Sequence, residues 1–157
     1  MSEKRDINIL MIDKQALKLG EPLEDFLNIS DETHIYTIRI CDSYTEALSM
    51  LKGVDIALIG LDLTKEYSMP GDKDFLPWIK EENAGYRFLV YLKREYPNIK
   101  VIMLVDYPAC EDPRSEMPEI LDKGADGYMV KPFVISELVE KIHCISLTYF
   151  SNKGNNS

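Results

Sequence analysis

Charged side chains stand directly after three apolar stretches of this sequence, and they are the first candidates for chemistry. They are Asp13, Asp62 and Lys131. In an open parallel sheet, ligands bind and reactions take place just beyond the carboxyl ends of the central strands. If the three stretches are strands of such a sheet, these groups share one edge, and we expect any binding or chemistry there.

Histidines and cysteines offer little alternative chemistry. His34 and His143 stand alone, without the spacing of metal ligands, so both are predicted to be structural and no metal site is expected. Three cysteines, Cys41, Cys110 and Cys144, lie far apart in the chain. An odd number without a CxxC pair is typical of free thiols in a reducing cytoplasm, and we expect all three to be structural or incidental.

Five stretches have the length and composition of strands. Three are apolar enough to be covered on both faces, as in the middle of a parallel sheet. A fourth alternates between polar and apolar residues and is rich in β-branched ones, which predicts an outer strand. In chain order the five are residues 7–12, 33–41, 54–63, 100–105 and 127–130.

Helical patterns separate these stretches. Gly20 and Pro22 interrupt the first, so that helix is expected to start late or to be kinked. The second opens on a capping box, Ser43 with Glu46, and Gly53 is expected to close it. Three more amphipathic helices are predicted over residues 86–92, 113–123 and 135–145.

One connection is unusually long. Residues 64–84 show no clear periodicity, and about twenty such residues are uncommon inside a compact domain. This insertion is either a lid or docking element beside the strand ends, or a surface excursion without a function. Residues 1–148 are expected to form one domain, followed by a flexible polar tail over residues 149–157.

The alternation of strands and helices sets the fold class. It predicts an α/β domain with a doubly wound parallel sheet and helices on both faces. A chain of 157 residues is long enough for one such core. The net charge of −9 argues against direct binding to nucleic acid or to an anionic membrane. No apolar run approaches the roughly 20 residues that span a bilayer.

The segment from Gly124 to Phe133 resembles the last strand and following loop of response-regulator receiver domains of the CheY type. Lys131-Pro132 matches the Lys-Pro pair of that family, and Tyr128 matches its switch aromatic. Residues 101–104 and 46–48 support the resemblance, which covers about residues 6–148. It implies a five-stranded parallel sheet of order 2-1-3-4-5, as in flavodoxin-like folds, and a module of two-component signalling.

The phosphorylation site that the resemblance implies is largely dismantled. The family has an acceptor aspartate after the third strand, two acids after the first that bind Mg²⁺, a hydroxyl residue after the fourth and a lysine after the fifth. Here Gly60 takes the place of the acceptor, Lys14 that of the second acid, and Val105 that of the hydroxyl residue. Asp13 and Lys131 remain. An ammonium group at the metal position repels Mg²⁺, and a glycine has no side chain to phosphorylate.

An alternative alignment makes Asp62 the phosphoacceptor. Gly60 and Asp62 point the same way along a strand, because side chains alternate with period two. Placing Gly60 in the acceptor position keeps the apolar pattern that follows the acceptor in the family. With Asp62 there, Lys65 would stand where an apolar residue belongs, and we therefore favour Gly60.

The remaining residues of this degenerate pocket carry more modest expectations. Asp13 and Lys131 are predicted to form an inherited ion pair that joins the strand ends. The ammonium of Lys14 either neutralises Asp13 or Asp62, which would close the site without Mg²⁺, or is simply solvated. Tyr128 and Pro132 lie on the face that the family uses for dimers and targets.

These observations predict an atypical receiver domain, a pseudo-receiver of the cytoplasm that signals through protein–protein interaction without being phosphorylated. Its partner is another signalling protein or a second copy of the chain, and neither enzyme activity nor a cofactor is expected. The alternative is a working phosphoacceptor that uses Asp62 with Mg²⁺. An enzyme or nucleotide binder has little support, because residues 13–15 replace any glycine-rich phosphate loop.

Overall fold

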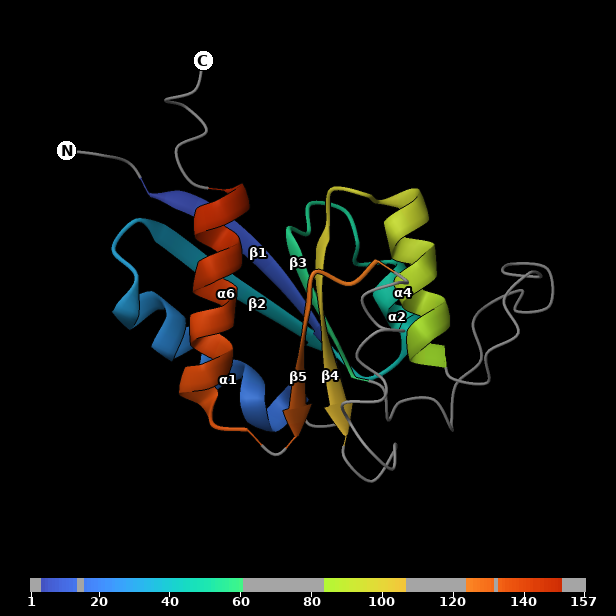
Figure 1. Cartoon of the computed structure of the whole chain (residues 1–157), viewed down its shortest axis with the longest axis horizontal. Coiled ribbons are helices and arrows are strands. Elements are labelled where there is room, and N and C mark those ends of the chain that lie inside the picture. Colours follow the sequence, from blue (N-terminus) through green and yellow to red (C-terminus); the bar gives the residue numbers. More distant parts are fainter. Residues whose placement is uncertain (1–3, 14–15, 61–83, 107–123, 132, 151–157) are drawn as a thin grey trace, which may run out of the picture.

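The computed structural model describes residues 4–13, 16–60, 84–106, 124–131 and 133–150. It contains one parallel sheet in the order β2-β1-β3-β4-β5 (Figure 1). This is the fold class and strand order expected from the sequence. The strands are β1 Arg5–Ile12, β2 His34–Cys41, β3 Ile56–Gly60, β4 Lys100–Asp106 and β5 Gly127–Lys131.

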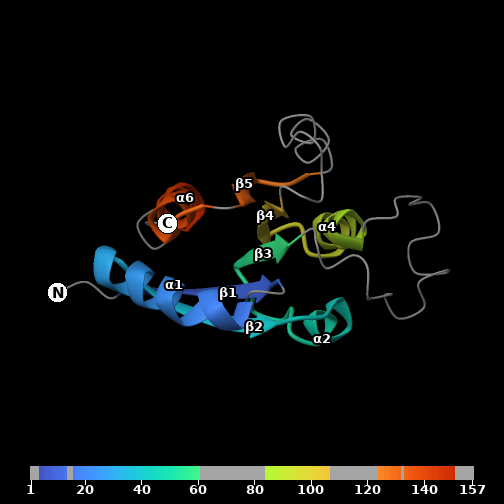
Figure 2. The ribbon, with the colours of Figure 1, turned by 90° about the horizontal axis from the view of Figure 1, so that it is seen from below.

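Helices cover both faces of the sheet. Figure 2 shows α1 and α6 on one side and α2 and α4 on the other. Among the described residues no helix has the length and apolar character needed to cross a membrane. The helices are α1 Ala16–Ser30, α2 Tyr44–Leu48, α4 Ala84–Glu95 and α6 Ile135–Tyr149.

The sheet separates two apolar layers. Along β1, Ile9 and Met11 pack in the layer under α1 and α6, while Leu10 and Ile12 pack in the layer under α2 and α4. All five residues of β3 are buried. A strand covered on both faces needs apolar residues at every position, which explains the continuous apolar stretches in the sequence.

Helix α1 does not start late, in contrast to our expectation. It begins at Ala16 and continues through Gly20 and Pro22. Gly20 is buried, and a Cβ atom at this position would lie 2.8 Å from Cγ2 of Ile40. The glycine therefore lets α1 approach β2 closely, and Pro22 lies on the exposed side of the helix.

Helix α2 is shorter than expected. The amide of Glu46 donates to the Ser43 hydroxyl at 3.1 Å, as the capping box predicts. The helix nevertheless ends at Leu48, and the amide of Ser49 donates to the carbonyl of Glu46 in a tighter turn. Gly53 has φ 80° and belongs to the turn before β3, so it does not close the helix.

Other element and domain boundaries that we expected from the sequence differ slightly in the structure or lie outside the described residues. Helix α4 begins at Ala84, so the last residue of the expected insertion is helical. Phe150 is buried just beyond the domain end expected at residue 148. Residues 64–83, the helix expected over 113–123 and residues 151–157 of the tail are not among those described.

The register brings the carboxyl ends of the central strands together. Ile12 at the end of β1 pairs with Ile59, and Gly60 at the end of β3 pairs with Leu104. On the far side of β4, Asp106 pairs with Lys131. The residue that follows β1, Asp13, thus lies at the same edge as Gly60 and Lys131.

Candidate functional site

A buried ion pair occupies the carboxyl edge of the sheet. The Nζ atom of Lys131 donates to both carboxylate oxygens of Asp13, at 3.0 and 2.8 Å. The Asp13 side chain is fully buried, and that of Lys131 is 10% exposed. Charges are rarely buried without a partner, and this pair gives each of the two groups an oppositely charged one. The pair ties the end of β1 to the end of β5 across the two strands between them.

Gly60 lies directly against this ion pair. A Cβ atom built at Gly60 would lie 2.8 Å from Cγ of Asp13 and closer still to its Oδ2 atom. The carboxylate of Asp13 therefore fills the space into which a side chain at position 60 would extend. An isolated glycine in a strand often marks such a close approach.

Two neighbours complete the surroundings of this edge. Val105 near the end of β4 is fully buried in the layer under α2 and α4, so its position contributes packing and offers no hydroxyl. Tyr44, the first residue of α2, is also fully buried, and its hydroxyl donates to the carbonyl of Gly60 at 3.0 Å. In the described part of this edge, a buried ion pair and a buried hydrogen bond therefore hold the strand ends.

Comparisons with known proteins agree with this architecture. No protein-family model matches the sequence. The response regulator protein VraR of Staphylococcus saprophyticus is 30% identical over 101 residues, which are 64% of this chain and 46% of VraR. The chain therefore spans less than half the length of that relative.

Solved structures share the fold. A response regulator from Thermotoga maritima matches 89% of this chain and 97% of its own, with 16% identity and a TM-score of 0.62. The receiver domain of NtrX from Brucella abortus matches 87% of this chain and 95% of its own, with 15% identity and a TM-score of 0.61. The chain has the receiver-domain fold.

The structure describes only some of the other residues that were predicted for the degenerate pocket and for the interaction face. Tyr128 is half-buried in β5 and packs beside the layer under α2 and α4, opposite Met103. This agrees with ordinary packing, and its role in an interaction face stays a prediction. Lys14, Asp62 and Pro132 lie outside the described residues.

The described cysteines have no catalytic surroundings. Burial raises the pKa of the Cys41 thiol to about 12, with the charge of Glu46 adding to the effect. At neutral pH this cysteine is therefore a thiol and a poor nucleophile. Cys144 is exposed on α6, and Cys110 lies outside the described residues. Within the described parts of the chain, no group of three or more His, Cys, Asp or Glu side chains could hold a metal ion.

A second polar cluster joins α1, β2 and α6 at the opposite edge of the sheet. Asp31 Oδ1 accepts from the amide and hydroxyl of Thr33, at 2.7 and 2.8 Å. Asp31 Oδ2 accepts from the Tyr36 hydroxyl at 2.7 Å and lies 2.8 Å from Nδ1 of His34. His143 on α6 lies 3.9 Å from the same oxygen. Both histidines therefore have structural surroundings.

The environment of Asp31 favours its charged form. Burial alone would raise the pKa of this carboxyl group, but the hydrogen bonds from Tyr36, Thr33 and His34 outweigh burial and hold the pKa well below its usual range. Burial and the neighbouring Asp31 raise the pKa of Tyr36, so its hydroxyl stays a donor. The charged carboxylate is therefore part of what stabilises the fold.

Replacing Asp31 with asparagine is expected to lower the free energy of unfolding by about 1–3 kcal/mol at pH 7, because buried donors lose their acceptor. A lowered pKa in the folded state gives stability that is present above the unfolded pKa and is lost as pH falls. The difference from wild type should therefore shrink below about pH 4. Urea unfolding at pH 7 and pH 3 measures it, with exposed Glu32→Gln as the control. An equal difference at both pH values would contradict the assignment.

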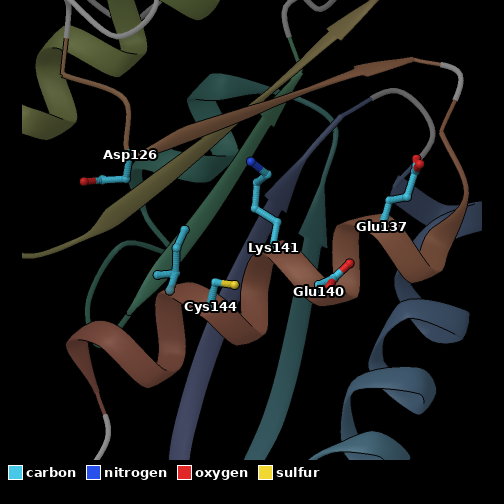
Figure 3. Close-up of a pocket in the computed structure, with 6 residues that line it drawn as sticks. Asp126, Glu137, Glu140, Lys141 and Cys144 are labelled. Atoms are coloured by element: carbon cyan, nitrogen blue, oxygen red, sulfur yellow. The ribbon is translucent and has the colours of Figure 1, made fainter.

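An open groove of about 370 Å³ lies between α6 and the segment just before β5. All of its lining residues except Asp126 belong to α6. In Figure 3 the carboxylate of Asp126, just before β5, points away from the labelled side chains of α6. Asp126 is already bound to Lys93 at 3.1 Å and to the amide of Val101 at 2.8 Å. The polar groups therefore do not converge on a common point, and we assign the groove no chemistry. Its lining residues are Asp126, Glu137, Glu140, Lys141, Cys144 and Ile145.

Sequence reasoning identified Asp13, Gly60 and Lys131, but it missed Tyr44, which supports Gly60, and Asp31, which organises the polar cluster at the opposite edge. Tyr44 carried a usable signal, since it follows the capping residue Ser43 and the tip of a buried tyrosine needs a partner. Asp31 carried another, because an aspartate two residues before a threonine is typical of a turn that bonds its own backbone. Neither signal says which distant group is contacted.

Proposed function

We propose that this chain is a receiver domain of two-component-type signalling, in the cytoplasm, that acts through protein–protein interaction without being phosphorylated. The observation that carries the proposal is Gly60 at the end of β3, with the Asp13 carboxylate filling the adjacent space. A phosphoacceptor site needs a carboxylate there that can attack a phosphoryl donor. In this fold the corresponding position has neither a side chain nor room for one.

Two further features support the proposal. Lys131, which contacts the phosphoryl group in the family that the sequence resembles, is already bound to Asp13. Val105 replaces the hydroxyl residue that would bond to the same group, and it is buried among apolar side chains. The signal would then depend on partner binding, on assembly with another copy or on the amount of protein, and Mg²⁺ would have no part in it.

Exposure to phosphoryl donors tests the proposal against the alternative acceptor Asp62. The protein is incubated with acetyl phosphate or with beryllofluoride, each with millimolar Mg²⁺, and is followed by intact mass and by amide chemical shifts. We expect no covalent adduct and no saturable change in shifts around Gly60.

A receiver domain that accepts phosphate under the same conditions serves as the positive control, and Asp62→Asn as the matched variant. An adduct on the wild-type chain that maps to Asp62 and disappears in Asp62→Asn would overturn the proposal. That result would assign the chain the alternative function, a phosphoacceptor with Mg²⁺ as its cofactor.

A further inference from the structure

The close contact between Asp13, after β1, and Gly60, at the end of β3, leaves no room for a second carboxylate at position 60. Asp13, just after β1, lies beside Gly60 at the end of β3. A Cβ atom at position 60 would already overlap the carboxylate of Asp13. An aspartate at position 60 extends further in the same direction. The present orientation of Asp13 and a side chain at position 60 are therefore mutually exclusive.

The Asp13 carboxylate lies in the side-chain space of residue 60 and is bound by Lys131, as the carboxylate of a phosphoacceptor at position 60 would be. Lys131 donates to both of its oxygens, at 3.0 and 2.8 Å, from the end of β5. Asp13 has no exposed surface, so the charge of Lys131 compensates it at short range in a poorly solvated site. Within this pair, one positive and one negative charge balance each other.

The backbone on both sides of the contact is fixed. The amide of Asp13 donates to the carbonyl of Cys41 at 3.3 Å, which holds the start of the loop after β1 against β2. The carbonyl of Gly60 accepts from the buried hydroxyl of Tyr44 at 3.0 Å. Neither strand end can move aside at low cost to admit another side chain, since packed interiors relax only partly around an inserted group.

We infer that the position of the carboxylate in this site has moved from β3 to the end of β1, where Asp13 supplies the group that Lys131 binds. Residue 60 is a glycine because the Asp13 carboxylate occupies the space of its side chain. This inference deepens the function proposed above and rests on it. The ion pair acts as a permanent internal lock that keeps the strand ends in one arrangement. Regulation then comes from what binds the domain, and the pocket itself does not switch.

A double-mutant cycle between Gly60 and Asp13 tests the lock. Gly60→Ala in the wild type is expected to lower the folding equilibrium constant by about tenfold to a hundredfold, as overpacking of a tight interior does. In the Asp13→Ala background the same change is expected to alter it by less than about threefold, because the space is then empty. Urea unfolding followed by circular dichroism measures all four proteins.

Gly127→Ala is the matched control, because the flexible Lys141 side chain is the nearest neighbour of a new methyl group at this β5 glycine, at 3.3 Å, and Cγ1 of Ile102 lies at an ordinary contact distance of 3.9 Å. It should change the equilibrium constant far less than Gly60→Ala. An equal loss from Gly60→Ala with and without the Asp13 side chain, or no loss in either background, would overturn the inference. The absence of a phosphoryl adduct, which tests the proposed function, would be unaffected by that result.

A second pair of variants keeps the test decisive if Gly60→Ala does not fold. Gly60→Asp alone places two carboxylates in one space and is expected to be the least stable protein of the series. Gly60→Asp combined with Asp13→Ala returns the carboxylate to β3 within reach of Lys131, and is expected to be more stable than Gly60→Asp alone. The opposite order of stability would overturn the inference.

Discussion

Replacing Lys131 with methionine is expected to lower the free energy of unfolding by about 3–5 kcal/mol. Methionine keeps most of the side-chain volume but removes the ammonium group that donates to both oxygens of Asp13. The fully buried carboxylate of Asp13 would then lose the ammonium group that is bound to both of its oxygens. The loss therefore measures the cost of removing this cation from a buried carboxylate, a larger quantity than the net value of the ion pair.

A companion variant separates these two quantities. Lys131→Met combined with Asp13→Ala removes both charges, and its loss should be clearly smaller than the sum of the two single losses. Lys52→Met, at an exposed position, controls for the change of residue type and should cost little. Urea unfolding at pH 7 measures the series. If Lys131→Met costs no more than Lys52→Met, the pair is not the buried bond described here.

Local sequence features were enough to predict the strands and a parallel sheet, while the strand order came from the resemblance to receiver domains. Residues 56–60 are buried on both faces of the sheet, and the sequence shows this as an unbroken apolar run. Residues 34–41 form an outer strand and alternate accordingly. Such patterns indicate whether one face or both faces of a strand are buried under helices, and this burial distinguishes a central strand from an outer one.

Helix boundaries were less predictable because they depend on contacts with distant residues. Gly20 looked like an interruption of α1, yet its lack of a side chain is what allows α1 to lie against Ile40 of β2. At α2, the capping residue Ser43 was correctly identified, but the helix ends before Gly53 and gives way to a turn. A glycine can end a helix or admit a close neighbour, and one sequence does not say which.

The site was predictable to the level of which residues meet, but their orientation was not. Asp13, Gly60 and Lys131 each end a strand or follow one, so the topology of a parallel sheet brings them to one edge. The Asp13 carboxylate turns toward the space of residue 60 because of its rotamer and its hydrogen bonds with Lys131. Rotamer and hydrogen bonds are set only when the strand ends come together, so the local sequence does not predict them.

Replacing Tyr44 with alanine is expected to lower the free energy of unfolding by about 3–5 kcal/mol, as the loss of a large buried aromatic side chain does. Tyr44 is fully buried, and its ring packs on that of Phe88 in α4, with centroids 5.0 Å apart. Its hydroxyl also holds the carbonyl of Gly60. The side chain therefore joins the packing of α2 and α4 to the end of β3.

Tyr44→Phe isolates the second of these contributions, because phenylalanine keeps the ring and removes only the hydroxyl. The carbonyl of Gly60 then loses a buried donor, and we expect a cost of about 1–3 kcal/mol. Tyr96→Phe, at a tyrosine that is 37% exposed, is the control and should be nearly neutral.

Amide chemical shifts give a second measurement of the effect of Tyr44→Phe. They should change at Gly60 and Asp13, since the ion pair depends on the position of the end of β3. Shift changes confined to α2 and α4 would mean that the hydroxyl stabilises local packing and does not support the ion pair.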